Sequence, residues 1–352
     1  MTDDIMAKTV RSLATATATA DERWNEIKRL RRELGHSEQE VERLNARLER
    51  YAYVRAADLR PVAWIAKPKS KQVHVATPVL MLSDLHLDEV VDLDEMDGVN
   101  AYDRDIAHGR LERIVNGAAD LAKNYVNGVS LQGIIVPLLG DIITGDIHDE
   151  LARTNAAPVP ATIVHWMPAL ASALRYLADE FGAVHVPTVD GNHDRTYKQT
   201  PKKKRAESSN AWIIYNWLAD TVRDDPRITF QISTSAEQQM KVYDTTLLLS
   251  HGDSFRSAGG VGGLYPSLLK WLLRRHAFYG AVGKPFDLAL IGHWHQLLWG
   301  QDFVVNGSLK GYDEYAKDGG FGFERPQQAM FFITPENGVV QRLPVFAEKG
   351  QR

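Results

Sequence analysis

Five short apolar runs are spread over more than two hundred residues, and each is followed by a cluster of polar side chains. Their length and apolar character predict buried β-strands, at residues 78–83, 133–139, 183–189, 245–250 and 287–291. Between them, apolar positions recur at helical spacing, which predicts amphipathic helices at residues 106–125, 161–181, 209–222 and 264–279. This alternation of strands and helices from residue 72 to 348 indicates an α/β domain.

The C-terminal part of this domain has a different pattern. From residue 288 onward the chain consists mostly of short apolar runs and turns, at 303–305, 330–334 and 339–346. Such a pattern is typical of strands joined by turns. We therefore expect a second sheet there.

The N-terminal region is expected to form two further parts. Residues 1–20 are small and polar and predict a flexible arm, and residues 21–71 predict a helical extension followed by a linker. The helical prediction rests on a 3-4 heptad spacing of apolar residues, at Ile27, Leu30, Leu34, Val41, Leu44, Leu48 and Tyr51. Gly35 is a natural helix stop, and Ser37 with Glu40 forms a capping-box pattern, so one long helix and a helical hairpin are both open. The function of residues 21–52 is then either a coiled coil, joining a second copy or a protein partner, or a helical pair packed on the body.

Composition limits the classes of protein to consider. The 352 residues are 44% hydrophobic and 24% charged, which are ordinary values for a globular chain with a sizeable core. The formal net charge of −4 argues against a protein that coats nucleic acid through bulk positive charge. No apolar stretch approaches the roughly 20 residues of a membrane helix, so we expect a cytoplasmic protein without membrane association. Because the chain has no cysteine, any metal must be bound by nitrogen and oxygen.

The polar segments after the apolar runs carry the candidate chemistry. In an open α/β sheet, ligands bind beyond the carboxyl ends of the strands, so segments from five parts of the chain can meet at one site. These segments contain Asp84 and His86, Gly140-Asp141, Gly191-Asn192-His193-Asp194, His251, and Gly292-His293-Trp294-His295.

Spacing within these segments suggests how they could bind two metal ions. Asp84 and His86 are two residues apart and would point to the same side of an extended strand, and His293 and His295 repeat this spacing. Two adjacent ions need a shared anionic bridge, for which Asp141 is the natural candidate, because Gly140 permits a close backbone approach. Asn192 and His251 would complete the second ion.

Taken together and in this order, these segments resemble the signature of the calcineurin-like metallophosphoesterase superfamily, over about residues 78–310. The resemblance implies a four-layer αββα sandwich with a di-metal site between its loops. It implies that one ion is bound by Asp84, His86, Asp141 and His295, and the other by Asp141, Asn192, His251 and His293. It also implies that His193 faces the substrate phosphate and stabilises or protonates the leaving oxygen, with Asp194 orienting it.

The third motif ends in Asp194 and the second continues as Ile142-Ile143-Thr144, so the Ser/Thr protein phosphatase branch is disfavoured. The Asp-terminated form is similar to DNA repair nucleases, cyclic-nucleotide phosphodiesterases and phage-borne members. Mixed imidazole and carboxylate ligands suit Mn²⁺, Fe²⁺ and Zn²⁺, and we expect Mn²⁺.

A basic run after His193 favours a nuclease acting on DNA. Positive charge beside the metals would attract a phosphate backbone, and an aromatic side chain could stack on a base. The candidate substrate-binding residues are Tyr197, Lys198, Lys202, Lys203, Lys204 and Arg205; a solvated surface loop is the alternative.

Two alternatives to a nuclease remain. One is a phosphodiesterase or phosphatase for cyclic nucleotides or other small phosphoesters. The other is a non-catalytic scaffold that acts through the N-terminal helices, against which the complete ligand set weighs.

Overall fold

The computed structural model describes residues 24, 27–32, 34–36, 38, 39, 42, 74–126, 128–199, 201–256 and 263–349. The chain divides into two compact units, Met1–Asp58 and Leu59–Arg352.

In the first unit, every described residue is helical. Gly35 is helical, as are its neighbours Leu34 and His36, so the helix does not stop at this glycine. Trp24, Ile27, Leu30 and Leu34 are between 41% and 59% exposed. The predicted flexible arm and the later heptad positions Val41, Leu44, Leu48 and Tyr51 lie outside the described residues, as do Ser37 and Glu40.

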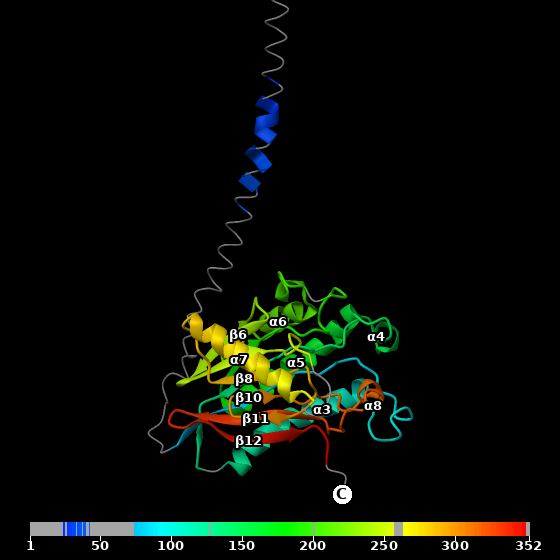
Figure 1. The fold of residues 1–352 in the computed structure, drawn as a ribbon, viewed down its shortest axis with the longest axis vertical. Coiled ribbons are helices and arrows are strands. Elements are labelled where there is room, and N and C mark those ends of the chain that lie inside the picture. The colour runs from blue at the N-terminus through cyan, green and yellow to red at the C-terminus, as the bar shows by residue number, and fades with distance from the viewer. Residues whose placement is uncertain are drawn as a thin grey trace, which may run out of the picture. The chain divides into compact units, whose positions relative to one another are not determined.

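The second unit contains two sheets within its described residues (Figure 1). The seven-stranded sheet has the order β12-β11-β1-β3-β4-β5, with β2 paired to β1. Its strands are β1 (Val75–Leu80), β2 (Ser130–Leu131), β3 (Ile134–Ile135), β4 (Val184–Thr188), β5 (Ile228–Ile232), β11 (Gln327–Thr334) and β12 (Gly338–Phe346). The five-stranded sheet has the order β6-β7-β8-β10-β9. Its strands are β6 (Glu237–Val242), β7 (Thr245–Ser250), β8 (Leu288–Ile291), β9 (Leu298–Trp299) and β10 (Phe303–Val305).

The helices of this unit include all four that the sequence predicts. α3 (Arg104–Asp120) continues into the π-helix η1 (Leu121–Tyr125), and the others are α5 (Val159–Phe181), α6 (Asn210–Thr221) and α7 (Tyr265–Ala281). Three short helices were not predicted: α4 (Leu151–Thr154), η2 (Ala206–Ser208) and α8 (Glu314–Asp318). None of the helices in the described part of the chain combines the length and apolar character needed to cross a membrane.

Side-chain alternation along the strands separates three apolar layers. In β1 and the residues after it, Val79 and Met81 pack between the sheets, whereas Leu80 and Leu82 pack towards the helices. In β8, Leu288 and Leu290 face the other sheet, while Ala289 and Ile291 pack with the α7 cluster that includes Trp271. Because successive strand residues point to opposite faces, both sheets are covered on both sides.

These layers give the order helices, sheet, sheet, helix. α3, α5 and α6 contribute to the apolar cluster on the outer face of the seven-stranded sheet, and α7 covers the five-stranded sheet, as Figure 1 shows for α7 over β8 and β10. The predicted α/β class and four-layer αββα sandwich are thus confirmed. The expectation for the C-terminus was wrong in part, because β11 and β12 extend the first sheet beside β1 rather than joining the second.

The strands that precede the polar segments run in the same direction within each sheet. β1, β3 and β4 pair in parallel, and so do β7 and β8. Their carboxyl ends therefore lie at one edge of each sheet. The predicted strand at 133–139 is reduced to Ile134–Ile135 with an isolated bridge at Leu138, since Pro137 between them has no N–H to donate.

β4 also contains a buried titratable group away from this edge. His185 is 6% exposed, with Nδ1 2.9 Å from the Thr229 hydroxyl and Nε2 3.4 Å from the Gln231 side-chain oxygen. Burial lowers the pKa of His185 from its ordinary value of 6.5 to about 4. Below pH 6.5 the unfolded chain takes up this proton while the folded protein does not, so stability falls as the pH drops from 6.5 to 4.

We predict that His185→Gln makes the protein less sensitive to acid. The shift in the pKa of His185 corresponds to roughly 3 kcal/mol of unfolding free energy lost by pH 4, and glutamine does not take up the proton. Urea unfolding of the metal-free protein at pH 7 and pH 4 measures this difference. His165→Gln, a change at an exposed histidine of α5, should keep the wild-type dependence, and equal acid sensitivity of all three proteins would refute the assignment.

Candidate metal centre

The polar segments adopt an unusual backbone conformation after their strands. Asp84, His86, Asp141, His293 and His295 all have φ between 47° and 72°. Few non-glycine residues adopt this left-handed conformation, and clusters of such residues occur at functional sites. Asp84 and His86 therefore do not share one side of an extended strand, as their spacing predicted, because the strand has ended and the loop turns both side chains inward.

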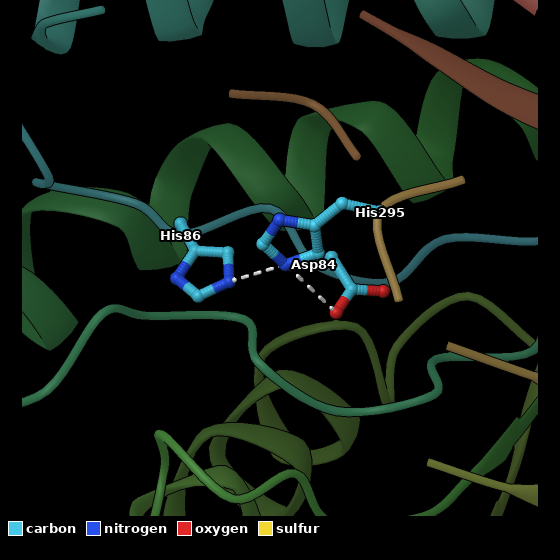
Figure 2. Close-up of side chains that lie close together, drawn as sticks. All are labelled: Asp84, His86 and His295. Carbon is cyan, nitrogen blue, oxygen red and sulfur yellow. Dashed lines mark hydrogen bonds and ion pairs between the residues drawn. The ribbon is translucent and has the colours of Figure 1, made fainter. Parts of the chain in front are cut away.

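One group of candidate ligands consists of Asp84, His86 and His295 (Figure 2). The Nε2 atoms of His86 and His295 are 3.1 Å apart, and His295 Nε2 lies 3.4 Å from Asp84 Oδ1. Asp84 and His86 are fully buried. One ligand atom from each residue lies within 4.8 Å of the others, which is the spacing of atoms that can bind one ion.

A second group consists of Asp141, His251 and His293, with Asn192 beside them. His251 Nε2 lies 3.1 Å from Asp141 Oδ2 and 3.0 Å from Asn192 Oδ1, while its Nδ1 donates to the Leu139 carbonyl oxygen at 2.7 Å. Burial opposes the charged form, but the Asp141 carboxylate raises the pKa of His251 to about 10. Without a metal, His251 Nε2 must carry a proton that faces the oxygens of Asp141 and Asn192. A metal cation between these three atoms would satisfy the same oxygens equally well.

Asp141 lies between the two groups. Its Oδ1 accepts the His193 N–H at 2.7 Å, whereas Oδ2 lies 3.1 Å from His251 Nε2 and 3.9 Å from His86 Nε2. Oδ2 is buried, and apart from the close contact with His251 Nε2 no hydrogen bond reaches it in the described part of the chain. Buried polar atoms are nearly always satisfied, so this oxygen fits a ligand shared by two ions.

Two further imidazoles, those of His86 and His293, are in the neutral form that binds metals. Burial lowers the pKa of His86, and burial with the neighbouring His251 lowers the pKa of His293 to about 4. A neutral imidazole has a free lone pair for coordination. The donor set contains only imidazole, carboxylate and amide groups, so it accommodates two divalent ions such as Mn²⁺, Fe²⁺ or Zn²⁺.

Two glycines allow the loops after β3 and β4 to touch. A Cβ atom on Gly140, which has φ of +86°, would lie 2.3 Å from the Gly191 nitrogen. One on Gly191 would lie 2.1 Å from Asp141 Oδ1. The predicted close approach at Gly140 therefore brings Asp141 directly against the Gly191-Asn192 segment.

Asp194 has a different role from the one expected. Its carboxylate accepts the N–H groups of Asp141, Gly191 and Ile143 at 2.7, 3.2 and 3.3 Å, and it is fully buried. These bonds fasten the loop after β3 to the loop after β4. Asp194 thus positions the backbone of Asp141 and does not orient the His193 ring.

The Thr144 carbonyl oxygen lies 3.0 Å from His193 Nδ1 and orients the ring instead. A carbonyl oxygen only accepts, so Nδ1 carries the proton and Nε2 is left for a substrate. The His193 ring lies 4.8 Å from the His86 ring, centroid to centroid, in an edge-on arrangement. Burial lowers the pKa of His193 to about 3.

Sequence reasoning missed the buried charges behind His86. Glu89 Oε2 lies 3.2 Å from His86 Nδ1 and accepts the Thr144 hydroxyl at 3.0 Å. Lys310 Nζ contacts Glu89 Oε1 at 2.6 Å and Asp313 Oδ2 at 2.5 Å. A carboxylate that holds the second nitrogen of a ligand histidine is a common feature of metal sites. The spacing of Glu89 three residues after His86 was the available signal, whereas nothing in the sequence marks Lys310.

The predicted substrate-binding residues fall into two groups. Tyr197, Lys198 and Lys202–Lys204 are exposed, although Lys198 Nζ contacts Asp149 at 2.8 Å. Arg205 differs, because its side chain is only 13% exposed and is paired with Asp190 and Asp253. Its donors already bind the protein, so the expectation that Arg205 contacts substrate does not fit its position.

No protein-family profile matches the chain, and no curated protein matches its sequence. A solved structure of a dimetal phosphatase from Danio rerio is similar at 11% identity and a TM-score of 0.33, covering 79% of this chain and 100% of that one. Another solved structure is similar at 9% identity and a TM-score of 0.34, covering 76% and 98%. Similarity at this level assigns no family.

We predict that Gly140→Ala disrupts the metal centre. A matched control is Gly182→Ala, because Gly182 also has positive φ, +80°, but a Cβ atom there meets nothing within 4 Å. Gly182→Ala should cost about 1–2 kcal/mol for the left-handed conformation alone, whereas Gly140→Ala should cost more than twice that and weaken Mn²⁺ binding. Urea unfolding and Mn²⁺ titration of both variants measure this, and equal effects would contradict the close approach.

Proposed function

We propose that this chain is a metallophosphoesterase of the calcineurin-like superfamily that uses two divalent metal ions. The observation that supports this most directly is the position of Asp141 Oδ2 between the ligand groups of His86 and His251. Two ions bound there would polarise a phosphoryl oxygen and activate water for in-line attack. The αββα fold and the order of the ligand segments along the chain agree with this assignment.

The chain's own residues then divide the work around the phosphate. Asp84, His86, Asp141 and His295 would hold one ion, and Asp141, Asn192, His251 and His293 would hold the other. His193, held at Nδ1 by the Thr144 carbonyl oxygen, presents Nε2 to the leaving oxygen. A bound phosphate favours the doubly protonated ring, from which Nε2 delivers its proton to the leaving oxygen while Nδ1 keeps the other. Glu89 lies 3.2 Å from His86 Nδ1 as an ion-pair partner, and Asp194 fixes the backbone of Asp141.

The proposed substrate is DNA, and the proposed ion is Mn²⁺. Lys202, Lys203 and Lys204 are exposed, and no ion-pair partner is recorded for them among the described residues. They follow the His193 segment closely, and the ends of the loop that carries them are tied to that segment. Arg195 donates to the Asn192 carbonyl oxygen at 2.5 Å and Arg205 to the Asp190 carboxylate at 2.6 Å. Three exposed cations that follow the candidate centre closely in the chain would suit a phosphate backbone.

The exposed apolar residues of the N-terminal helix support a separate proposal about partners. Ile27, Leu30 and Leu34 keep the heptad spacing and are exposed within the first unit. Such a stripe suits a coiled coil, so we propose that residues 21–52 pair with a second copy of the chain.

We predict that the Mn²⁺-loaded protein hydrolyses labelled DNA and that chelation abolishes this activity. Asp141→Asn should remove it, and His193→Ala should lower the rate by about 10²–10⁴, the contribution of a positioned proton donor. His74→Ala, at an exposed histidine just before β1, is the control and should be fully active. Turnover of bis-p-nitrophenyl phosphate without DNA cleavage would indicate that the substrate is a small phosphodiester. Turnover of neither compound would refute the proposed enzymatic activity.

We predict that replacing Lys202, Lys203 and Lys204 together with Ser weakens DNA binding without affecting hydrolysis of the small diester. The slope of log affinity against log salt should fall by up to about 2.7, because each lost phosphate contact removes about 0.9. Serine at the exposed cations Lys270, Arg274 and Lys284, in and after α7, is the matched control. An unchanged salt slope in the first variant would show that these lysines do not hold DNA.

A further inference from the structure

Arg205 ends the basic run, but its side chain points into the protein. Nε donates to Asp190 Oδ2 at 2.6 Å, and Nη1 and Nη2 each donate to one oxygen of Asp253 at 3.0 Å. Nη2 also lies 3.4 Å from the Asp190 carbonyl oxygen. Asp190 is 3% exposed, and the side chain of Asp253 is 11% exposed. One guanidinium group thus binds two largely buried carboxylates.

The two carboxylates lie on loops that leave different sheets. Asp190 stands two residues before Asn192, after β4 of the seven-stranded sheet, and Asp253 stands two residues after His251, after β7 of the five-stranded sheet. Arg205 therefore connects the carboxyl edges of the two sheets. Asn192 and His251, whose ligand atoms lie 3.0 Å apart, approach each other across this same connection.

Other bonds connect the two sheets on the opposite side of the centre. The His293 N–H donates to the Asp84 carboxylate at 2.9 Å, and the Asn306 side chain donates to the Ser83 hydroxyl at 2.9 Å. The first bond joins the loops that carry Asp84 and His293, the second joins the residue after β10 to the loop of Asp84, and neither involves Arg205. The spacing of the first ligand group is consequently supported without the guanidinium, whereas Arg205 acts together with the bond from His251 Nδ1 to the Leu139 carbonyl oxygen in holding the loops of Asn192 and His251 together.

We propose that Arg205 is a positioning residue for the second metal ion, the one held by Asp141, Asn192, His251 and His293. This inference rests on the proposed two-metal function. The rigid guanidinium fork matches both carboxylates in a fixed geometry, which the single nitrogen of a lysine cannot reproduce. Without the fork, two buried negative charges lose their partner, and the loops that carry Asn192 and His251 lose one of the contacts that set their separation.

The test is a titration of metal-free protein with Mn²⁺. Calorimetry and the electron paramagnetic resonance signal of free Mn²⁺ both measure how much of the ion is bound. The wild type should bind two ions. Arg205→Gln and Arg205→Lys should keep one affinity and weaken the other by about 10–100-fold, the usual effect of losing a residue that supports a ligand. If Arg205→Lys binds the second ion as weakly as Arg205→Gln does, the geometry of the guanidinium fork matters and its positive charge alone is not enough.

Arg227→Gln is the matched control. Arg227 also joins two aspartates, Asp179 at 2.8 Å and Asp225 at 2.6 Å, but it lies between α6 and β5 and its side chain is 41% exposed. Its loss should leave both Mn²⁺ affinities unchanged. Circular dichroism establishes that each variant is folded, and if Arg205→Gln does not fold, Asp253→Asn removes part of the clamp while the pair with Asp190 remains.

The outcomes separate the inference from the proposed function. The role of Arg205 would be overturned if the wild type binds two ions and the folded Arg205 variants bind both with unchanged affinity. If the Arg205 variants do not fold, unchanged affinities in Asp253→Asn would have the same meaning. Either result would leave the phosphoesterase assignment intact. A wild type that binds fewer than two Mn²⁺ ions would overturn the two-metal function and this inference with it. Equal weakening of both ions would also overturn it, since the clamp is argued to act on one.

Discussion

The Asp194 carboxylate holds together the part of the molecule on which the candidate centre depends. By accepting the N–H groups of Asp141, Ile143 and Gly191, it fastens the loop after β3 to the loop after β4. The contact is possible because Gly140 and Gly191 have no side chains to separate the backbones. Asp141 is thereby held with one oxygen bonded to the His193 N–H and the other directed between the two ligand groups.

Buried charged side chains lie around this contact, and many of them have a partner of opposite charge among the described residues. Lys310 lies between Glu89 and Asp313, and Arg205 lies between Asp190 and Asp253. Each cation is almost removed from water, where an unpaired charge would be very costly. The first cluster contacts His86 through Glu89, and the second joins the loops of Asn192 and His251.

Much of the fold could be predicted from the sequence, because the central strands and main helices have strong apolar patterns. β5 and β6 were missed because their residues alternate poorly, as in Glu237-Gln238-Gln239 of β6, and pair at the margins of the sheets. The ligand segments were recognisable from residue type and order. Their left-handed backbone, the bonds of Asp194 and the burial of Arg205 were not, because each depends on residues distant in the chain. A basic run gives no sign of which cation turns inward, whereas the structure separates Arg205 from the three lysines before it.

The left-handed conformation of Asp84, His86, Asp141, His293 and His295 has a consequence for engineering. These five side chains cannot be transferred to regular strands of another scaffold at the same sequence spacing, because alternate strand residues leave the backbone in directions that these loops do not use. Reconstruction of the centre requires the loops themselves, with their glycine contacts and their carboxylate fastening. The transferable unit is the backbone of five loops, and the ligands are its final detail.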